Sequence, residues 1–364
     1  MIPSFMLTRL AAAAVLGCSL VVSLFGGPPP LHVSGNQVLD PSGTAPRLRG
    51  VNCAGLEWSS TSDGHIARSV IVAVQEWHAN IIRLPLSQDR WFGKAPEQTD
   101  DGAAYRALVR EIAEFCAVHD CYLLLDLHWS NAGEWGRYIG QHNMPDRHSL
   151  TFWLDVAAQF ANNPALLFDL YNEPKRVTWD RWLHGGLISE IDEKTRVPLT
   201  YESVGMQALV DAIRAAGAKN LIVANGINWA YELEGVLPDR MLKDPDGQGI
   251  VYGMHPYPRT YEGFGRETIP HWAARMEKFG ERLPFIVGEF GSMERKWPFP
   301  PEWNMSDEKW NRAMLATLEE HKWNWIAWDF HPSAWPCLIT DWNYAPTPEF
   351  GVWVKEALAA NRGS

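Results

Sequence analysis

The stretch LLFDLYNEP, residues 166–174, decides the fold that this sequence predicts. It begins as a continuous apolar run, which is typical of a parallel strand that helices cover on its outer face. Polar side chains, Asn172 and Glu173, follow at its end, and Pro174 ends the regular structure there. The stretch therefore indicates a sheet of β-then-α units that carries polar groups at the carboxyl ends of its strands.

Seven further segments repeat this pattern along the chain. The expected strands are residues 47–52, 81–86, 122–128, 166–173, 221–226, 250–257, 284–291 and 324–331. Helical periodicity is found at 64–79, 103–119, 148–162, 200–217, 271–281 and 306–322, with a final helix at 349–360, whereas the connection 227–249 is short and irregular. Eight such units without a break in composition predict an α/β fold, a single (β/α)₈ TIM barrel over residues 47–364.

The N-terminal segment has the features of an export signal. Arg9 precedes an uncharged run with an apolar part at residues 10–25, followed by two glycines and three prolines. We expect residues 1–27 to be a signal peptide or membrane anchor, and residues 28–46 to be a linker and N-terminal segment. Residues 15–18, VLGC, also resemble a lipoprotein box. The protein is therefore expected to be secreted or held in the cell envelope, with membrane contact only through an uncleaved leader.

Four cysteines follow the leader, and an exported protein can keep disulfides. Cys53 and Cys337 follow the first and eighth strands, which are neighbours in a closed barrel, so we expect them to pair. Cys116 and Cys121 would then form the second pair, across a helix-to-strand turn. The alternative is that all four are reduced and buried.

Charge and composition limit the class of partner. The 364 residues carry a net charge of −11, and no run of basic residues stands out, which argues against nucleic acid as a partner. Nineteen tryptophans are more than a core of this size usually needs. Indole rings can stack on the C–H face of a sugar and donate to its hydroxyls. The candidates for such stacking are Trp58, Trp129, Trp135, Trp179 and Trp229.

The chemistry of a barrel of this kind lies at the carboxyl ends of its strands. Two glutamates, Glu173 and Glu289, each end a strongly apolar strand. Glycoside hydrolysis uses two carboxyl groups, ~5–5.5 Å apart when the configuration is retained and ~6.5–9.5 Å apart when it is inverted. Strands four and seven lie on opposite arcs of the barrel mouth, so the two side chains can converge. Asp126 and Asp169 lie deeper on their strands and are interpreted as structural partners of Arg49 or Arg83.

The ordered set of strand ends resembles glycoside hydrolase family 5, a clan-A barrel family with many cellulases and mannanases, over residues 47–358. The resemblance implies that Glu173 is the acid/base and Glu289 the nucleophile. It also implies supporting roles near the substrate for Arg83, His128, Asn172, His255, Tyr257 and Trp328. Two features depart from the family pattern: Trp129 follows His128 where many members have Asn, and residues 329–332 read DFHP.

The resemblance implies retaining hydrolysis of β-glycosidic bonds, with endo-β-1,4-glucanase activity as the first expectation. The partner would be a β-glycan polysaccharide or oligosaccharide, the protein a monomer, and no metal or organic cofactor is expected. Mannan, xylan, xyloglucan or β-1,3-glucan are alternative substrates, and exo action is an alternative mode. A non-catalytic glycan-binding barrel and a metal-dependent hydrolase using His128 and His255 are the competing functions.

Overall fold

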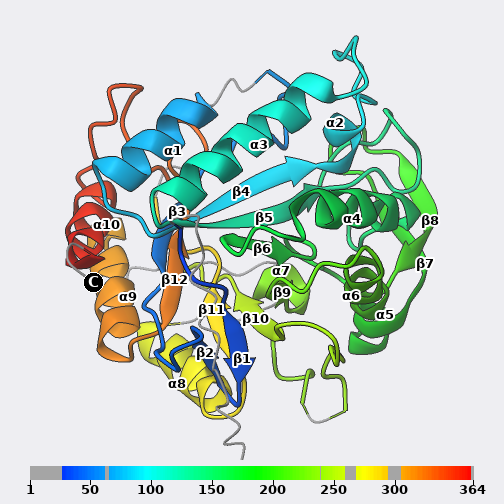
Figure 1. The fold of residues 1–364 in the computed structure, drawn as a ribbon. Helices are drawn as coiled ribbons and strands as arrows, with labels where there is room; N and C mark the ends of the chain where they lie inside the picture. Colours follow the sequence, from blue (N-terminus) through cyan, green and yellow to red (C-terminus); the bar gives the residue numbers. More distant parts are fainter. Residues whose placement is uncertain (1–26, 62–64, 238, 259–267, 294–304, 362–364) are drawn as a thin grey trace, which may run out of the picture.

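Eight parallel strands close into a barrel in the computed structural model, which describes residues 27–61, 65–237, 239–258, 268–293 and 305–361 (Figure 1). Each strand pairs in parallel with the next, and the last pairs with the first. In barrel order they are β3 (Arg49–Asn52), β4 (Ile81–Ser87), β5 (Tyr122–Trp129), β6 (Leu166–Asp169), β9 (Ile222–Asn225), β10 (Ile250–Met254), β11 (Phe285–Val287) and β12 (Asn324–Ala327). The expected barrel is confirmed, and every one of its strands begins within three residues of the predicted start.

The barrel interior changes from apolar to polar along the strands. Because successive side chains on a strand face opposite sides, Tyr122, Leu124, Asp126 and His128 share one face of β5. Tyr122 and Leu124 belong to an apolar cluster that fills the amino-terminal end of the barrel, together with residues of the other strands. The polar members of the same face therefore lie toward the carboxyl-terminal end, where the chain places its charged groups.

Helices surround the barrel and cover its outer face (Figure 1). The longer ones are α1 (Ile66–Gln75), α3 (Ala103–Val118), α4 (Arg147–Phe160), α6 (Met206–Ala215), α8 (Ile269–Gly280), α9 (Asp307–Glu320) and α10 (Gly351–Leu358). Three short helices, α2 (Gln88–Trp91), α5 (Trp179–His184) and α7 (Ile227–Ala230), lie in loops after strands. Among its described residues, the connection 227–249 holds only the short segment α7, as its irregular sequence indicates. Asp146 begins α4 with a capping box, which satisfies backbone N–H groups that a helix start leaves open.

The prediction of a helix over residues 200–217 is wrong in its first part. Residues 185–204 form an antiparallel hairpin of β7 (Gly185–Ile191) and β8 (Pro198–Val204), and α6 begins only at Met206. Along β8 the residues Leu199, Tyr201 and Ser203 are buried while Thr200 and Glu202 are exposed. This alternation with period two is the pattern of a half-buried strand. The helical periodicity begins only after it, and the predicted helix therefore started too early.

The segment expected as a linker packs against the amino-terminal end of the barrel. Its short hairpin, β1 (His32–Ser34) and β2 (Gln37–Leu39), contributes Leu31 and Val38 to the apolar cluster there. The Tyr122 hydroxyl donates to the Pro29 carbonyl at 2.7 Å, which holds the start of the described chain beside the start of β5. Of the expected leader, residues 1–27, all but Gly27 lie outside the described residues, Cys18 included. Within the described ranges, no helix combines the length and the apolar character needed to cross a membrane.

The two expected disulfides are absent among the described cysteines. Cys53, Cys116, Cys121 and Cys337 are all buried, and no S–S bond joins any two of them. Cys53 packs in the layer between the barrel and its helices, where its electrostatic neighbours include Cys116 on α3. The Cys116 and Cys121 side chains do approach one another, but as hydrogen-bonded thiols, and Cys121 Sγ also contacts the Tyr122 carbonyl oxygen at 3.4 Å. The pairs expected from strand order are therefore not formed, and all four thiols are reduced and buried, which was the alternative.

Candidate active site

The guanidinium of Arg83 organises the polar end of the barrel. It lies on β4, is fully buried, and contacts three carboxylates: Asp126 at 3.0 Å, Asp169 at 2.9 Å and Glu289 at 2.8 Å. It also donates to the side-chain oxygens of Asn52 and Asn172. Because three buried carboxylates surround one cation, the pKa of Arg83 is raised and the group stays charged.

The two aspartates are structural partners of Arg83, as the sequence indicated, whereas Arg49 pairs with Glu319 at the other end of its strand. Burial raises the pKa of Asp126 to about 7 and that of Asp169 to about 8, although Arg83 opposes both changes. Asp169 also accepts a hydrogen bond from Asn225 on β9 at 2.8 Å. The aspartates therefore hold Arg83 in place below the surface on which a substrate would lie.

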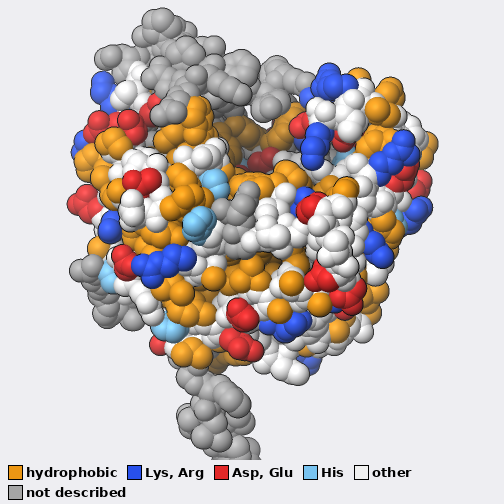
Figure 2. All heavy atoms as spheres, turned by 90° about the horizontal axis from the view of Figure 1, so that it is seen from above, with side chains coloured by type: hydrophobic (Ala, Val, Ile, Leu, Met, Phe, Trp, Pro, Cys, Tyr) orange, Lys and Arg blue, Asp and Glu red, His pale blue; other side chains and the backbone are white. Residues whose placement is uncertain are grey.

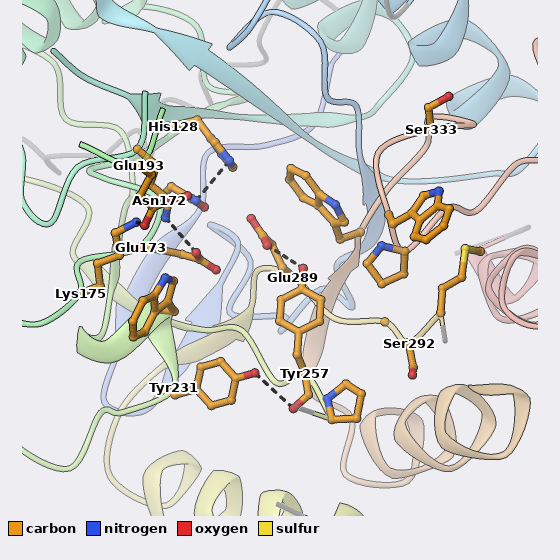
Figure 3. Close-up of a pocket in the computed structure, with 18 residues that line it drawn as sticks. His128, Asn172, Glu173, Lys175, Glu193, Tyr231, Tyr257, Glu289, Ser292 and Ser333 are labelled. Carbon is orange, nitrogen blue, oxygen red and sulfur yellow. Dashed lines mark hydrogen bonds and ion pairs between the residues drawn. The ribbon is translucent and has the colours of Figure 1, made fainter. Parts of the chain in front are cut away.

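A short hydrogen-bonded chain orients Asn172. His128 Nδ1 lies 2.6 Å from Asp126 Oδ2, and His128 Nε2 lies 3.2 Å from the Asn172 amide nitrogen. Burial lowers the pKa of His128 to about 4, so the ring is neutral at neutral pH. The neutral ring donates from Nδ1 to Asp126 and accepts at Nε2 from Asn172. These hydrogen bonds hold the Asn172 side chain in position, and Figure 3 shows it beside Glu173.

Glu289 follows β11 and has a donor at each carboxylate oxygen. Arg83 Nη1 contacts Oε1 at 2.8 Å, and the Tyr257 hydroxyl donates to Oε2 at 2.7 Å. The residue is 4% exposed, so these contacts act in a site that excludes most water. A cation and a phenol hydroxyl together stabilise a carboxylate anion that faces the cavity.

Glu173 has a different environment. Burial raises the pKa of its carboxyl group, and the donor Gln141 opposes that rise through a 2.8 Å hydrogen bond to Oε2. The other oxygen, Oε1, lies 3.0 Å from Nδ1 of His255 on the loop after β10. Burial lowers the pKa of His255 to about 3, so this ring too is neutral. Glu173 thus lacks the direct cationic contact that Glu289 has, and its protonated form is favoured relative to a solvent-exposed glutamate.

The two glutamates face one another across a cavity of about 610 Å³ (Figure 3). One oxygen of Glu173, one oxygen of Glu289 and a ring nitrogen of His255 all lie within 4.8 Å of each other. Trp328 lines the same cavity and stacks on His128 at 5.4 Å between ring centroids. The structure therefore brings together all eight residues for which the resemblance implied a catalytic or supporting role.

The comparisons with known proteins agree with this arrangement. Residues 39–334 match the family model for cellulase, described as glycosyl hydrolase family 5. The chain belongs to glycosyl hydrolase family 5. Among curated relatives, Endoglucanase MaCel5A of a Microbulbifer strain is 23% identical over 90% of this chain and 58% of its own length. Endoglucanase C of Evansella cellulosilytica is 25% identical over 82% of this chain and 35% of its own length. This family-5 chain thus spans only about a third to three fifths of those two relatives.

Solved structures support the family-5 fold. A β-glucanase from Saccharophagus degradans in complex with cellotetraose superposes with a TM-score of 0.70 at 20% identity, covering 93% of this chain and 95% of that chain. The catalytic domain of a Thermobifida fusca endoglucanase, also in complex with cellotetraose, gives a TM-score of 0.60 at 16% identity, covering 90% and 96% of the two chains.

The predicted stacking tryptophans do not all lie at the cavity of this family-5 chain. Trp229 lines it, together with Trp328 and Trp335. The others lie outside its lining: Trp58 packs against His331, Trp129 is half-buried at the end of β5, Trp135 stacks on His148, and Trp179 packs on Trp182. Trp335, which is 38% exposed, was not among the five predicted candidates, because it follows no strand directly.

Gln141, Lys175 and Glu193 are among the polar cavity residues that were missed from the sequence, and Tyr231, Ser292 and Ser333 are others. Gln141 lies in a long loop without periodicity, and Glu193 lies in the turn of the hairpin whose second strand was predicted, from residue 200 on, as part of a helix. Lys175 follows Pro174 directly, and this was the only signal that could have identified it. Among the described residues, one group of side chains could hold a metal ion: Glu173, His255 and Glu289. Because two of these residues, Glu173 and Glu289, line the cavity, a cation there would compete with their acid and base chemistry.

Proposed function

We propose that this chain hydrolyses β-1,4-glucan at internal bonds with retention of configuration, using Glu289 as nucleophile and Glu173 as acid/base. The observation that carries the proposal is the facing pair of carboxyl groups, with oxygens within 4.8 Å of one another in unlike surroundings. This separation suits the retaining mechanism, whose carboxyls lie ~5–5.5 Å apart, because no water has to fit between them and the sugar. The names of the curated relatives, endoglucanases, and the cellotetraose held by two structural neighbours support glucan as the substrate.

The reaction follows from the two environments. Glu289 attacks the anomeric carbon, and the bond to the leaving oxygen breaks as Glu173 transfers its proton to that oxygen. The glycosylated Glu289 no longer carries a negative charge, so Glu173 ionises more easily and then takes a proton from water. That water attacks the anomeric carbon from the side that the leaving group vacated, and Glu289 is released as a carboxylate. Arg83 and Tyr257 stabilise this carboxylate at the start and the end of the cycle.

The surroundings of the pair fit the same reaction. Asn172 is held beside Glu173, where its amide can reach a sugar hydroxyl, and Trp328 offers an indole surface to the same cavity. On the face that Figure 2 shows, acidic and basic side chains are interspersed rather than gathered by sign, which fits an uncharged polymer better than a charged one.

The test compares the purified protein with Glu173→Ala and Glu289→Ala on carboxymethylcellulose, β-mannan, xylan and laminarin, with reducing ends quantified. Release from carboxymethylcellulose alone, lost in both variants, supports the proposal. Release mainly from another polymer would overturn the substrate but keep the mechanism. Glu202→Ala is the matched control, because this glutamate is exposed on β8 and does not line the cavity.

Azide distinguishes the two roles. With an aryl β-cellobioside as substrate, azide replaces water in the second step of Glu173→Ala and yields the β-glycosyl azide. In Glu289→Ala azide takes the place of the nucleophile and yields the α-glycosyl azide. Exchanged products would reverse the two assignments, and no azide product in either variant would argue against a retaining mechanism.

We also infer that the protein is exported by its first 27 residues and acts as a monomer on its glycan. Sequencing the N-terminus of the protein recovered from the source cells tests the first inference. Light scattering of the purified protein tests the second, because a mass near 41.1 kDa or slightly less is expected for one chain.

A further inference from the structure

One loop residue contacts the proposed acid/base directly. Gln141 Nε2 donates to Glu173 Oε2 at 2.8 Å from the loop between β5 and α4. Residues 130–146, all of which the structure describes, contain no helix or strand. A loop of this kind cannot hold a side chain in place through regular backbone hydrogen bonds, so the position of Gln141 depends on what the loop contacts.

The residue after Gln141 is a buried histidine whose two ring nitrogens both face acceptors. His142 is 1% exposed, its Nε2 lies 2.6 Å from the Tyr138 carbonyl oxygen, and its Nδ1 contacts Glu190 Oε1 on β7. A carbonyl oxygen can only accept, so Nε2 carries a proton. Glu190 Oε2 accepts from the Asn143 backbone N–H at 2.8 Å, as a carboxylate does, so a second proton lies between Nδ1 and Oε1. His142 and Glu190 are therefore an imidazolium–carboxylate ion pair.

The surroundings of His142 favour its charged form, in contrast to those of His128 in the catalytic site. His128 Nδ1 also faces a carboxylate, but its Nε2 faces an amide donor and needs no proton. At His142, burial lowers the pKa of the ring, but the hydrogen bond and the charge of Glu190 outweigh burial, so that pKa lies above the ordinary histidine value. Asp146, which begins α4, adds a further negative charge, and Tyr201 of β8 packs edge-on with 6.0 Å between ring centroids. No basic side chain is among these neighbours, so the charged ring is stable at neutral pH.

The loop is attached at His142 on two sides. The Tyr171 hydroxyl accepts from the His142 backbone N–H at 3.1 Å and donates to the His142 carbonyl oxygen at 3.0 Å. Tyr171 lies two residues before Glu173, just beyond the end of β6. The side chain of His142 is bound to the hairpin through Glu190, and Figure 1 shows this β7–β8 hairpin beside α4, where the loop ends. Gln141 therefore extends from a backbone that Tyr171 holds on one side and Glu190 on the other.

We propose that the His142–Glu190 ion pair is a positioning device for the acid/base. It holds the loop in the place where Gln141 can donate to Glu173. Burial of such a pair costs solvation, and either partner left alone here would be an unpaired buried charge. The loop therefore keeps this path only when both partners are present. This inference rests on the proposed function and adds to it, because it makes a residue of the hairpin, Glu190, a determinant of how readily Glu173 gives up its proton.

The direction of the effect follows from what Gln141 does. Burial raises the pKa of Glu173, and the donor Gln141 opposes that rise, because a donor stabilises an ionised carboxyl group more than a protonated one. Loss of the ion pair releases Gln141, so the pKa of Glu173 should rise further. A purely electrostatic effect would lower that pKa or leave it unchanged, because removal of the Glu190 carboxylate leaves either an unpaired positive ring or a neutral one. A rise is therefore diagnostic of positioning.

The test follows kcat/KM for cellopentaose from acidic to alkaline pH, because the basic limb of this profile reports ionisation of the acid in the free enzyme. Glu190→Ala removes the ion pair, and its basic limb should move to higher pH by about 0.5–1 pH unit, the size expected for one hydrogen bond to a carboxylate. Glu190→Gln can donate to a neutral His142 ring and accept from Asn143, so it keeps both contacts, and its basic limb should stay with that of the wild type. Glu202→Ala, exposed on β8 of the same hairpin, is the matched control and should also keep the wild-type profile.

Two double variants test how the pair acts. With Gln141→Leu in place, Glu190→Ala should move the basic limb no further, because both changes remove the same contact. His142→Phe combined with Glu190→Leu replaces the pair by apolar side chains and leaves no buried charge, so this variant should fold even if Glu190→Ala does not. Its basic limb should move to higher pH as that of Glu190→Ala does. Thermal unfolding of each variant establishes that it is folded.

The outcomes separate the inference from the proposed function. A folded variant without the ion pair whose basic limb stays in place, or moves to lower pH, would overturn the inference and leave the proposed function intact. Shifts of Gln141→Leu and Glu190→Ala that add in the double variant would overturn it as well, and so would a shift in Glu190→Gln as large as that in Glu190→Ala. A wild type that does not cleave cellopentaose would overturn the proposed function and this inference together.

Discussion

Replacing Arg83 by methionine tests the reasoning about the polar end of the barrel most directly. The substitution keeps an unbranched side chain but leaves Asp126, Asp169 and Glu289 buried without their shared cation. Removing one partner of a buried ion pair typically costs about 3–5 kcal/mol of stability. We therefore expect Arg83→Met to lower the free energy of unfolding by about 3–5 kcal/mol at pH 8.

The loss of stability caused by Arg83→Met should become smaller as the pH falls. The pKa values of Asp126 and Asp169, about 7 and about 8 in the folded wild type, already lie above the ordinary aspartate value, and loss of Arg83 raises them further. Between the unfolded and folded pKa values the folded variant binds more protons than the unfolded chain, so its stability rises with acidification. Each carboxyl contributes up to about 1.4 kcal/mol per pH unit within that window. At pH 5 the variant should therefore be closer to the wild type than at pH 8.

Urea unfolding followed by tryptophan fluorescence at pH 5 and pH 8 measures both effects. Arg49→Met is the matched control: this arginine lies on the neighbouring strand β3 but pairs with Glu319, whose side chain is 31% exposed. Arg49→Met should lower the free energy of unfolding by less than Arg83→Met does, and this decrease should not become smaller at pH 5. A loss below about 1 kcal/mol for Arg83→Met at pH 8, the size expected of an exposed pair, would refute the reasoning. A loss that grows on acidification would refute it too.

Four smaller perturbations test other parts of the site. Gln141→Leu removes a donor that stabilises ionised Glu173, so the pKa of Glu173 should rise and the basic limb of the kcat/KM profile should move to higher pH; a shift to lower pH would contradict this. Tyr257→Phe removes the donor to Glu289 Oε2 and should lower kcat/KM by about tenfold or more without changing the melting temperature by more than a few degrees. Gly288→Ala places a Cβ 2.9 Å from His255 Nε2 and should therefore lower kcat. Gly140→Ala is the control, because a Cβ there meets nothing within 4 Å. Equal effects of the two substitutions on kcat would argue against a role for the packing of His255. Prolonged dialysis against a chelator should leave glucan hydrolysis unchanged, because each proposed step uses side chains alone, and activity that returned only with added metal would reject that mechanism.

Strand ends were the part of the site that the sequence could predict. Residues such as Glu289 and His128 follow apolar runs at a fixed place in each β-then-α unit, and a closed barrel brings all such places to one mouth. Asp126 and Asp169 could be identified as structural because strand parity puts them on the inward face below that mouth.

Loops carried the residues that could not be predicted. Gln141 reaches Glu173 from a loop whose path depends on Glu190, a residue of a hairpin almost fifty positions away. No local periodicity encodes such a contact, because it depends on how two loops pack on each other. The cysteines illustrate the same limit: neighbouring strands suggested that Cys53 pairs with Cys337, but no S–S bond joins the two in the structure, and Cys53 has Cys116 on α3 among its electrostatic neighbours.

The hairpin β1–β2 at the amino-terminal end of the barrel has a consequence for orientation. Pro29 is fixed beside the start of β5, while the catalytic cavity opens at the far ends of the strands. The start of the described chain therefore lies on the side of the molecule remote from the cavity. A molecule attached to a surface on that side would present its cavity outward, toward a polymer in the surroundings.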